Sequence, residues 1–464
     1  MTHLHIIGIC GTAMAGLAIM AKEKGLRVTG SDSGIYPPMS TLLESMAIPL
    51  QEGFHPDHLE PRPDLVLVGN AISRGNPELE AVLDRDIPYC SGAQWLFEQV
   101  LAGRHAVVAS GTHGKTTTTS LLACLWEEAG WQPGFLIGGI PLDFGRGARL
   151  PQGPWVMVEG DEYDTAFYDK RPKFLHYRPK TLIINNLEFD HADIYADLEA
   201  IRRQFRLLLR TVPASGHLLV NGDDPEVNAL LPFACSRVVT YGLADRHTFT
   251  ARLEGADGRC WTLFQEGIPL FTVQWHLLGV HNVTNGLAAA AAALVNGMAP
   301  EPVKAGLEKF QGVARRLQQR FEVNRIAVYD DFAHHPTAIA TTLAGLRAGI
   351  GSARLWVVLE PRSNTMRTRV HQDRLASAFA AADRVILARP QPRGLTADQL
   401  LDVEAVVAQC NQGGEPSAAV VVADAHEAVV LLGRHCLPGD HVVIMSNGGF
   451  DGIHHKLQQE LSRS

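Results

Sequence analysis

Short apolar segments alternate with amphipathic segments along almost the whole chain. The apolar runs that predict buried strands are His3–Ile9, Arg27–Gly30, Leu65–Val68, Ala106–Ala109, Trp155–Glu159, Thr181–Asn185, Ile326–Tyr329, Leu355–Leu359, Val385–Leu387, Val420–Val422 and His441–Ile444. The amphipathic or Ala-rich runs predict helices over Ala13–Lys24, Pro77–Asp84, Thr116–Gly130 and Leu287–Leu294. Such alternation is typical of parallel sheets covered by helices, so the sequence predicts an α/β fold.

The pattern divides the chain into three blocks, which we predict to be domains covering residues 1–104, 105–317 and 318–464. A length of 464 residues agrees with more than one domain. Between residues 240 and 275 the pattern changes to short β-like runs with turns. This stretch predicts a small antiparallel part within the middle block.

Composition narrows the classes of protein that fit. Apolar residues make up 46% of the chain and charged residues 19%, which is enough for packed cores. The net charge of −8 argues against non-specific binding to nucleic acid or to an anionic membrane. The seven cysteines are scattered and form no CxxC pair, which argues against zinc knuckles and a disulfide scaffold. With no apolar stretch of about 20 residues and no signal-peptide pattern, we expect a cytoplasmic enzyme.

The first glycine-rich turn, residues 6–16, joins a predicted strand to a predicted helix. Free N–H groups at the start of such a helix can hold a diphosphate. Asp32 follows at the end of the second strand, where a Rossmann acid would hold a ribose. Cys10, however, stands where the second glycine of GxGxxG belongs. A nicotinamide dinucleotide, the diphosphate of a nucleotide sugar and a turn without ligand therefore all remain open, and the nucleotide sugar is favoured.

The second glycine-rich turn is the stronger signal. Residues 109–118 read Ala-Ser-Gly-Thr-His-Gly-Lys-Thr-Thr-Thr between a buried strand and a helix, although a strict Walker motif has Gly at position 109. We predict that Lys115 reaches the β- and γ-phosphates of ATP and that the Thr116 hydroxyl holds Mg²⁺. The predicted phosphate loop consists of Gly111, Thr112, His113, Gly114, Lys115, Thr116 and Thr117.

Acidic side chains and a histidine follow two further strands of the middle block. Residues 159–164 supply four carboxylates directly after one strand, and His191 lies six residues beyond the end of the next run, Thr181–Asn185. The carboxyl ends of parallel strands meet at one edge of the sheet, which is also the edge of the phosphate loop. Glu159 and His191 are therefore candidate metal ligands beside Thr116, because a triphosphate-bound Mg²⁺ needs polar ligands there.

Five motifs then occur in a fixed order: Gly111-Thr-His-Gly-Lys-Thr-Thr117, Glu159-x-Asp-Glu162, Asn186-x-x-x-Asp-His191, His281-Asn-x-x-Asn285 and Asp331-x-x-His-His-Pro336. Together they resemble the Mur ligases, the ATP-dependent amide ligases of peptidoglycan assembly. The resemblance covers essentially the whole chain. It implies a Rossmann-like N-terminal domain for a UDP-sugar, a central P-loop ATPase domain and a Rossmann-like C-terminal domain that binds ATP and the acceptor.

The resemblance also implies roles for individual residues. In the family the first turn binds the UDP diphosphate, which assigns the UDP-sugar to Gly11, Thr12, Ala13 and Met14, with Asp32 nearby. Asn282 and Asn285 would contact ATP from the central domain, and Asp331 would contact it from the C-terminal domain. Arg316, at the predicted domain junction, matches an arginine that meets the γ-phosphate. Lys115, Glu159, His191 and Arg316 are thus the predicted catalytic set, and ATP and Mg²⁺ the predicted cofactors.

Within the family, the stretches Asp161–Arg171, Glu360–Met366 and Ser446–Phe450 most resemble the branch that joins UDP-N-acetylmuramate to the tripeptide L-Ala-γ-D-Glu-meso-diaminopimelate. The branch that adds a single L-alanine is the alternative. A tripeptide with three carboxylates calls for arginine, so Arg362, with Ser363 and Asn364 beside it, is the predicted acceptor site. His335 is expected to line the same site.

Two other classes of protein compete with this hypothesis. A nicotinamide oxidoreductase would use the first turn and Asp32 but would leave the phosphate loop unexplained. A P-loop switch protein would bind ATP without ligase chemistry. We expect a monomer or weak homodimer that binds neither nucleic acid nor membrane.

Overall fold

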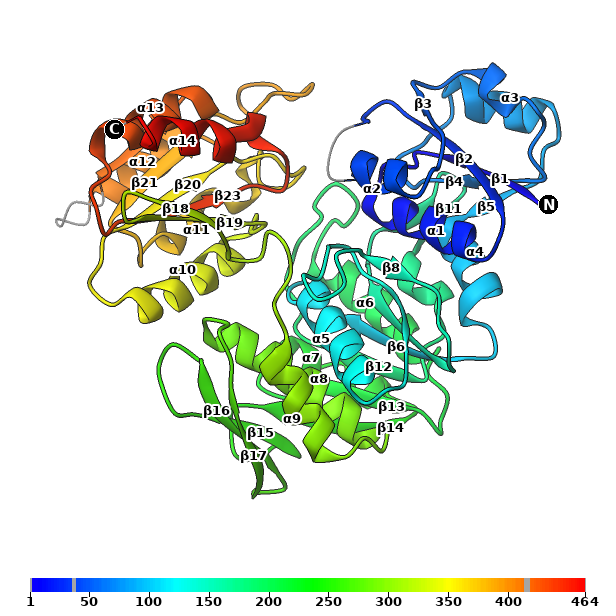
Figure 1. The fold of residues 1–464 in the computed structure, drawn as a ribbon, viewed down its shortest axis with the longest axis horizontal. Helices are drawn as coiled ribbons and strands as arrows, with labels where there is room; N and C mark the ends of the chain where they lie inside the picture. The colour runs from blue at the N-terminus through cyan, green and yellow to red at the C-terminus, as the bar shows by residue number, and fades with distance from the viewer. Residues whose placement is uncertain (1, 36–38, 413–417, 464) are drawn as a thin grey trace.

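The computed structural model describes residues 2–35, 39–412 and 418–463. Within them, three large sheets, each with its own helices, form an N-terminal, a central and a C-terminal domain (Figure 1). The expected three-domain α/β architecture is therefore confirmed, while the boundaries after residues 104 and 317 stay predictions. No helix in the described ranges is both long and apolar enough to cross a membrane.

The N-terminal domain has a five-stranded parallel sheet of order β3-β2-β1-β4-β5. This is the strand order of a Rossmann half-fold with β1 at its centre. Its elements are β1 (His3–Ile7), α1 (Thr12–Glu23), β2 (Arg27–Asp32), α2 (Met39–Ser45), β3 (Leu50–Glu52), β4 (Leu65–Val68), α3 (Pro77–Asp84), β5 (Tyr89–Ser91) and α4 (Gly92–Leu96).

The central domain is built on a ten-stranded sheet of order β17-β16-β15-β14-β13-β12-β6-β9-β7-β8. Its strands are β6 (His105–Ser110), β7 (Gly134–Leu136), β8 (Ala148–Arg149), β9 (Trp155–Gly160), β12 (Thr181–Ile184), β13 (His217–Asn221), β14 (Arg237–Gly242), β15 (Phe249–Leu253), β16 (Cys260–Gln265) and β17 (Ile268–Gln274). The predicted antiparallel part exists as β15–β17, and it extends the edge of the parallel sheet because β15 pairs in parallel with β14. A separate hairpin, β10 (Asp164–Ala166) and β11 (Asp169–Pro172), follows β9.

Helices α5 (Lys115–Glu128) and α8 (Val280–Val295) pack against the same core of the central sheet. Residues 288–293 of α8 are six alanines, all fully buried, and such small side chains let a helix approach its neighbours closely. The predicted helix Leu287–Leu294 is therefore too short, because α8 begins seven residues earlier, directly after Gly279. The remaining helices are α6 (Leu198–Leu209), α7 (Pro225–Asn228) and α9 (Pro300–Lys309).

The C-terminal domain has a six-stranded sheet of order β18-β19-β23-β20-β21-β22, parallel except for β18. Buried apolar clusters cover both of its faces. The elements are β18 (Gln318–Val323), β19 (Ile326–Asp331), α10 (Pro336–Ile350), β20 (Leu355–Leu359), α11 (Gln372–Ala378), β21 (Arg384–Ala388), α12 (Val403–Asn411), β22 (Ala418–Val422), α13 (Ala425–His435), β23 (His441–Met445) and α14 (Ile453–Leu461).

The N-terminal and central domains are packed directly together. One apolar cluster contains residues of both, including Leu17 of α1 and Leu136 of β7. At Gly16 of α1 an added Cβ would lie 2.5 Å from Leu136 Cδ1, so only glycine allows this close approach. The start of α1, where the first glycine-rich turn lies, is thereby held against the central domain.

Candidate active site

The phosphate loop joins β6 to α5, as predicted. Gly111 has a φ of +123°, and a Cβ there would lie 2.8 Å from the Asn186 carbonyl oxygen. Gly114 has a φ of +82°, and a Cβ there would lie 2.3 Å from Asn285 Oδ1. Both positions require glycine, since the left-handed backbone and the crowding each exclude a side chain.

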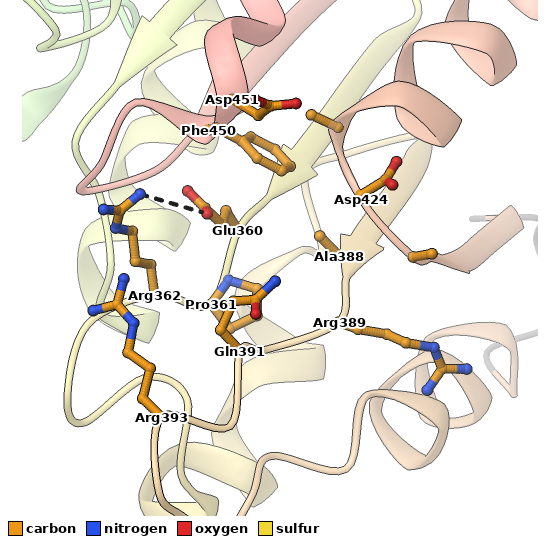
Figure 2. A pocket seen from close by; sticks show the side chains of 12 residues that line it. Glu360, Pro361, Arg362, Ala388, Arg389, Gln391, Arg393, Asp424, Phe450 and Asp451 are labelled. Atoms are coloured by element: carbon orange, nitrogen blue, oxygen red, sulfur yellow. Dashed lines mark ion pairs between the residues drawn. The ribbon is translucent and has the colours of Figure 1, made fainter.

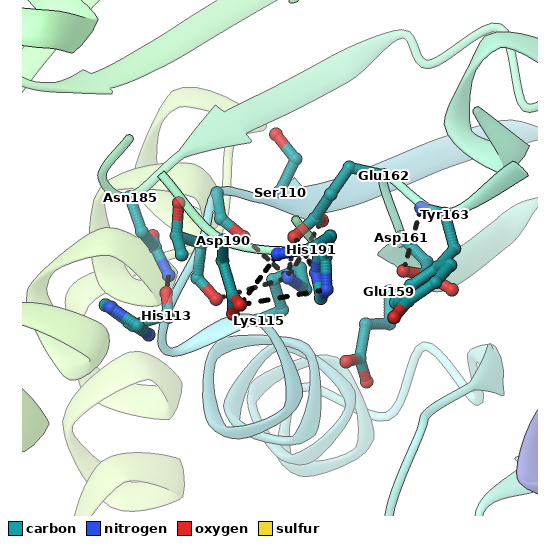
Figure 3. Close-up of polar contacts among 12 residues, drawn as sticks. Ser110, His113, Lys115, Glu159, Asp161, Glu162, Tyr163, Asn185, Asp190 and His191 are labelled. Carbon is teal, nitrogen blue, oxygen red and sulfur yellow. Dashed lines mark hydrogen bonds and ion pairs between the residues drawn. The ribbon is translucent and has the colours of Figure 1, made fainter. Parts of the chain in front are cut away.

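The loop is held from outside by the segment that follows β12 (Figure 3). The backbone N–H of His113 donates to Asn186 Oδ1 at 2.7 Å, and that of Thr112 donates to the Asn186 carbonyl at 3.1 Å. Asn185 Nδ2 donates to Thr118 Oγ1 at 3.0 Å, at the start of α5. Asn285 Oδ1 accepts from the same hydroxyl at 3.3 Å, which places α8 against the loop.

Lys115 and His191 share one carboxylate, that of Glu162 (Figure 3). Lys115 Nζ lies 2.8 Å from Glu162 Oε2, and His191 Nε2 lies 2.9 Å from Glu162 Oε1. Burial alone would lower the pKa of Lys115 and of His191, but Glu162 outweighs it and raises both. Both shifts favour the cationic forms of the side chains, which suit the binding of phosphate oxygens.

Thr116, Glu159 and Arg316 meet at one point between two domains. The Thr116 hydroxyl donates to Glu159 Oε1 at 2.9 Å and accepts from Arg316 Nη2 at 3.2 Å. The other carboxylate oxygen of Glu159 accepts the backbone N–H of Gly138 at 2.7 Å. Burial raises the pKa of Glu159, against the opposing effect of Lys115. Predicted residues more than 150 positions apart in sequence are therefore brought into direct contact.

Asp331, the last residue of β19, anchors the segment that carries Arg316. Its two oxygens accept the backbone N–H groups of Leu317 at 2.6 Å and Ala333 at 2.8 Å. Burial raises its pKa to about 6, although the Arg316 guanidinium acts in the opposite direction.

A cavity of about 490 Å³ lies where these groups meet. Central and C-terminal residues line it, including the predicted ATP residues Thr112, His113, Gly114, Lys115, Thr116, Thr117, Asn282, Asn285, Arg316 and Asp331. Gly111 is the one residue of the predicted phosphate loop that is not among the lining residues. Asn282 Nδ2 donates to the Leu278 carbonyl at 2.8 Å, which ties the first turn of α8 to the segment before it.

The predicted UDP-sugar residues of the first glycine-rich turn differ in their exposure to solvent. Gly11 and Thr12 are exposed at the start of α1 and Ala13 is half-buried, whereas Met14 is buried and packs beside Gly92. Met14 can therefore offer a ligand only its backbone. Asp32 accepts the backbone N–H groups of Cys10 and Gly34, each at 2.9 Å, so its carboxylate shapes the turn.

The predicted acceptor residues lie after β20. Arg362 lines a second cavity, of about 90 Å³, at the carboxyl ends of the C-terminal strands (Figure 2). Ser363 Oγ accepts the Met366 N–H at 3.1 Å, and Asn364 Nδ2 donates to Asp193 of the central domain at 2.8 Å. His335 lies elsewhere: it is buried at the start of α10 and lines the larger cavity, with its ring centroid 4.8 Å from that of His113.

Several residues of the site carried too weak a signal to be singled out from the sequence. Glu162 is the second glutamate of an acidic run. The spacing of that run does not indicate that Glu162 pairs with Lys115 while Glu159 pairs with Thr116. Arg367 donates from Nη2 to Asn364 Oδ1 at 2.9 Å, while its Nε and Nη1 are buried without a hydrogen-bond partner. Two unpaired guanidinium nitrogens are a feature that only the folded chain reveals.

Comparison with known proteins identifies the family. Models described as "Mur ligase family, catalytic domain", "Mur ligase middle domain" and "Mur ligase, glutamate ligase domain" match residues 3–104, 109–293 and 315–448. The chain belongs to the Mur ligase family. The members of this family are ATP-dependent amide ligases, which accounts for a phosphate loop that faces a second domain.

Three similar proteins refine the position within the Mur ligases. UDP-N-acetylmuramate–L-alanyl-γ-D-glutamyl-meso-2,6-diaminoheptandioate ligase of Escherichia coli is 46% identical over 99% of this chain and 98% of its own. UDP-N-acetylmuramate–L-alanine ligase of Burkholderia cenocepacia is 31% identical, with the same coverage. The crystal structure of a murein peptide ligase from Psychrobacter arcticus is 40% identical, with a TM-score of 0.77 over 100% of this chain and 99% of its own.

The donor set beside the phosphate loop fits Mg²⁺, which is typical of Mur ligases. The Thr116 hydroxyl and the Glu159 carboxylate are hard oxygen donors in direct contact with each other. His191 is turned toward Glu162, so its part in metal binding stays a prediction.

We expect that E162Q destabilises the protein by about 3 kcal/mol, because it leaves the buried Lys115 ammonium without its counter-charge. The loss is measured as a lower midpoint of thermal unfolding. E199Q is the matched control: Glu199 is an exposed carboxylate on α6 that pairs with Arg202 and Arg206. Its removal should change little, since exposed pairs contribute little. Equal shifts in the two variants would contradict the role given to Glu162.

The raised pKa of Asp331 predicts a pH dependence of stability. Because folding favours the protonated form, the contribution of Asp331 is present below about pH 4 and is lost as the pH rises through about 6. The shift corresponds to about 3 kcal/mol. D331N lacks this titration, so its unfolding midpoint should vary less between pH 4 and 7 than that of the wild type. The exposed Asp245 provides the control D245N, and a D331N curve parallel to the wild-type curve would refute the assignment.

Proposed function

We propose that this chain joins the lactyl carboxylate of UDP-N-acetylmuramate to the amine of L-Ala-γ-D-Glu-meso-diaminopimelate, with conversion of ATP to ADP and phosphate. One observation carries the proposal. Similarity to a relative named for this reaction extends over the whole chain and clearly exceeds the similarity to an L-alanine ligase. The L-alanine ligase activity is the second candidate function.

The reaction explains why a ligase needs a phosphate loop. A carboxylate does not react with an amine until one of its oxygens becomes part of a leaving group. Attack of the carboxylate on the γ-phosphorus gives an acyl phosphate and releases ADP. The amine then attacks the acyl carbon, loses a proton, and the tetrahedral intermediate expels phosphate. Such phosphoryl transfer depends mainly on alignment and on neutralisation of charge.

The residues of the larger cavity match these needs. Lys115 would bind the β- and γ-phosphate oxygens, and Arg316 would approach the γ-phosphate from the junction between the central and C-terminal domains. Thr116 and Glu159, with His191 nearby, would hold Mg²⁺, which when bound neutralises phosphate charge. Asn282, Asn285 and Asp331 would contact the nucleotide. The contact between Thr116 and Arg316 supports this proposal, because it brings the phosphate loop together with the segment at the domain junction.

The UDP-sugar would bind at Gly11–Met14. The exposed start of α1 supports this assignment, because its backbone N–H groups can hold a diphosphate. The position of Asp32 weakens the nicotinamide alternative: its carboxylate is engaged with the backbone of Cys10 and Gly34 and has less capacity for a ribose. Asp32 would then support the turn that binds the sugar nucleotide.

The acceptor peptide would reach the C-terminal domain at the ends of β20 and β23. Figure 2 shows Arg362 and Arg393 on one side of the smaller cavity there. Arg362 has only a long contact, 3.9 Å, with Glu360, so its guanidinium is available for a carboxylate. Arg367, with two unpaired buried nitrogens, is a second candidate. Ser363, Asn364 and His335 belong to the predicted acceptor set, of which Asn364 is already engaged with Asp193.

We further propose the division into domains at residues 104 and 317, a cytoplasmic location, and a monomer or weak homodimer. The ranges matched by the three family models, 3–104, 109–293 and 315–448, support the division into domains.

The acceptor assay tests the proposal. Phosphate release from ATP is measured with Mg²⁺ and UDP-N-acetylmuramate, with either the tripeptide or L-alanine added. We expect release with the tripeptide that exceeds release with L-alanine by at least tenfold. The reverse preference would establish the second candidate function, and release that ignores both acceptors would remove the ligase hypothesis.

The role of Arg362 predicts a selective defect. R362A should raise the KM for the tripeptide by about tenfold or more, because a charge-assisted hydrogen bond to carboxylate contributes about 1.5–3 kcal/mol. The KM for ATP should change less than twofold. R389A is the control: Arg389 also lines the cavity, but it pairs with Glu404 and points away in Figure 2. An unchanged KM for the tripeptide in R362A would refute the assignment.

A further inference from the structure

Three side chains from separate segments converge on the far side of the phosphate loop from Glu159. They are His113 of the loop, Glu188 after β12 and His335 at the start of α10. One ring nitrogen from each histidine and one carboxylate oxygen lie within 4.8 Å of one another. Neither the reaction chemistry nor the predicted magnesium set uses this group as a unit.

Two ring nitrogens of this cluster have no hydrogen-bond partner, while His335 Nδ1 accepts the Thr337 backbone N–H at 3.3 Å. His113 Nε2 and His335 Nε2 are both buried without a hydrogen-bond partner. Glu188 Oε1 lies 3.7 Å from His113 Nε2, and Glu188 Oε2 lies 3.8 Å from His335 Nδ1, both too long for hydrogen bonds. Native structures rarely leave buried imidazole nitrogens unpaired, so the arrangement calls for an explanation.

We propose that His113, Glu188 and His335 form a second divalent-metal site, suited to Zn²⁺ or a similar transition-metal ion. Two imidazoles and one carboxylate are a ligand set that Zn²⁺ takes with one position left open. Mg²⁺ prefers an all-oxygen shell and belongs with Thr116 and Glu159. Bonds of about 2.0–2.1 Å place tetrahedral ligand atoms about 3.3 Å apart, so the cluster must contract by roughly 1.5 Å at its widest.

The surroundings prepare the ligands for this role. The Thr337 hydroxyl donates to Glu188 Oε2 at 2.7 Å, which orients the carboxylate and leaves Oε1 toward His113. The ring of His371 packs edge-on against that of His335, with centroids 4.6 Å apart. Burial lowers the pKa of His113 well below its ordinary value and that of His335 to about 4, and both shifts favour the neutral imidazole that binds metal ions.

The guanidinium of Arg374 would compete with a metal ion for Glu188. Arg374 Nη2 lies 3.5 Å from Glu188 Oε2 and would compete for the carboxylate. More than half of the Arg374 side chain is exposed, so it can turn to solvent when an ion binds. R374A should therefore bind the ion more tightly than the wild type.

A bound ion would connect two domains. His113 and Glu188 belong to the central domain and His335 to the C-terminal domain, while His113 also precedes Lys115 by two residues. The ion would hold the domains together at the phosphate loop and slow the opening that nucleotide exchange requires. Micromolar Zn²⁺ should then inhibit ATP turnover in the presence of excess Mg²⁺.

Calorimetric titration with Zn²⁺ in excess Mg²⁺ tests the site directly, without reference to ligase activity. We expect one tight site in the wild type, and at least a tenfold weaker Kd in H335A and in E188Q. H455A, which removes an exposed histidine of α14, should bind as the wild type does. Titration with Co²⁺ should give the visible absorption of a tetrahedral N/O site in the wild type and H455A alone.

E188Q keeps the shape of the side chain, so it decides the question even if H335A does not fold. Equal Zn²⁺ affinity in E188Q and the wild type would overturn the proposal, as would the absence of a tight site in the wild type. Since the test uses no sugar nucleotide or peptide, its failure leaves the proposed function untouched. Failure of the acceptor assay would likewise leave the metal site standing.

Discussion

The side chain of Lys115 is only 13% exposed at the first turn of α5, and the buried carboxylate of Glu162 supplies the charge that allows the ammonium to remain there. A buried cation without a partner would cost several kcal/mol. The segments that carry Lys115 and Glu162 must therefore stay in contact in the folded protein. Lys115 also donates to the Gly111 carbonyl at 2.7 Å, which closes the phosphate loop on itself. His191 contacts the same carboxylate. Glu162, two residues after the end of β9, therefore holds both the phosphate loop and the segment that follows β12.

The second constraint is the contact between domains. Loops at the carboxyl ends of the central strands meet loops of the C-terminal domain through single polar contacts: Arg316 with Thr116, Asn364 with Asp193, Thr365 with the Ala192 backbone and Thr337 with Glu188. Most of these groups are only partly buried, and such contacts contribute little each. The apolar cluster between the N-terminal and central domains is large, whereas among the described residues the C-terminal core takes in Leu278, just before α8, only as a partly buried neighbour. The C-terminal domain is therefore the part that can move at low cost.

The sequence predicted the strands and loops that carry the site, but it did not predict which side chains of the site pair with each other. Strand and loop positions followed from apolar runs and from glycines such as Gly111 and Gly114. These glycines can be recognised locally, because the turn itself requires a positive φ. The partner of Glu162 depends on how the chain after β9 turns relative to Lys115, and a run of four acids carries no information on that. The family resemblance assigned Met14 to the UDP-sugar, yet helical geometry turns its side chain into the core. The start of α8 was missed because the polar residues His281, Asn282, Thr284 and Asn285 interrupt the apolar pattern.

The junction between the last two domains shows how the two cavities are linked. Arg315 has a φ of +63°, an uncommon conformation for a non-glycine residue, and it sends adjacent guanidinium groups to different partners. Arg316 reaches Thr116, whereas Arg315 Nη2 donates to the carbonyls of Ser446 at 2.7 Å and Gly448 at 2.6 Å. Both guanidinium groups also lie over the ring of Phe332.

Gly448 in turn lies against the predicted acceptor arginine: a Cβ there would come within 2.3 Å of the Arg362 guanidinium. A continuous path of contacts thus runs from the phosphate loop through Arg316 and Arg315 to the loop that positions Arg362. A movement of the C-terminal domain that separates Arg316 from Thr116 must also shift the acceptor loop relative to the phosphate site. If Arg362 binds the acceptor as proposed, the acceptor amine would meet the activated carboxylate only when the ATP site is assembled.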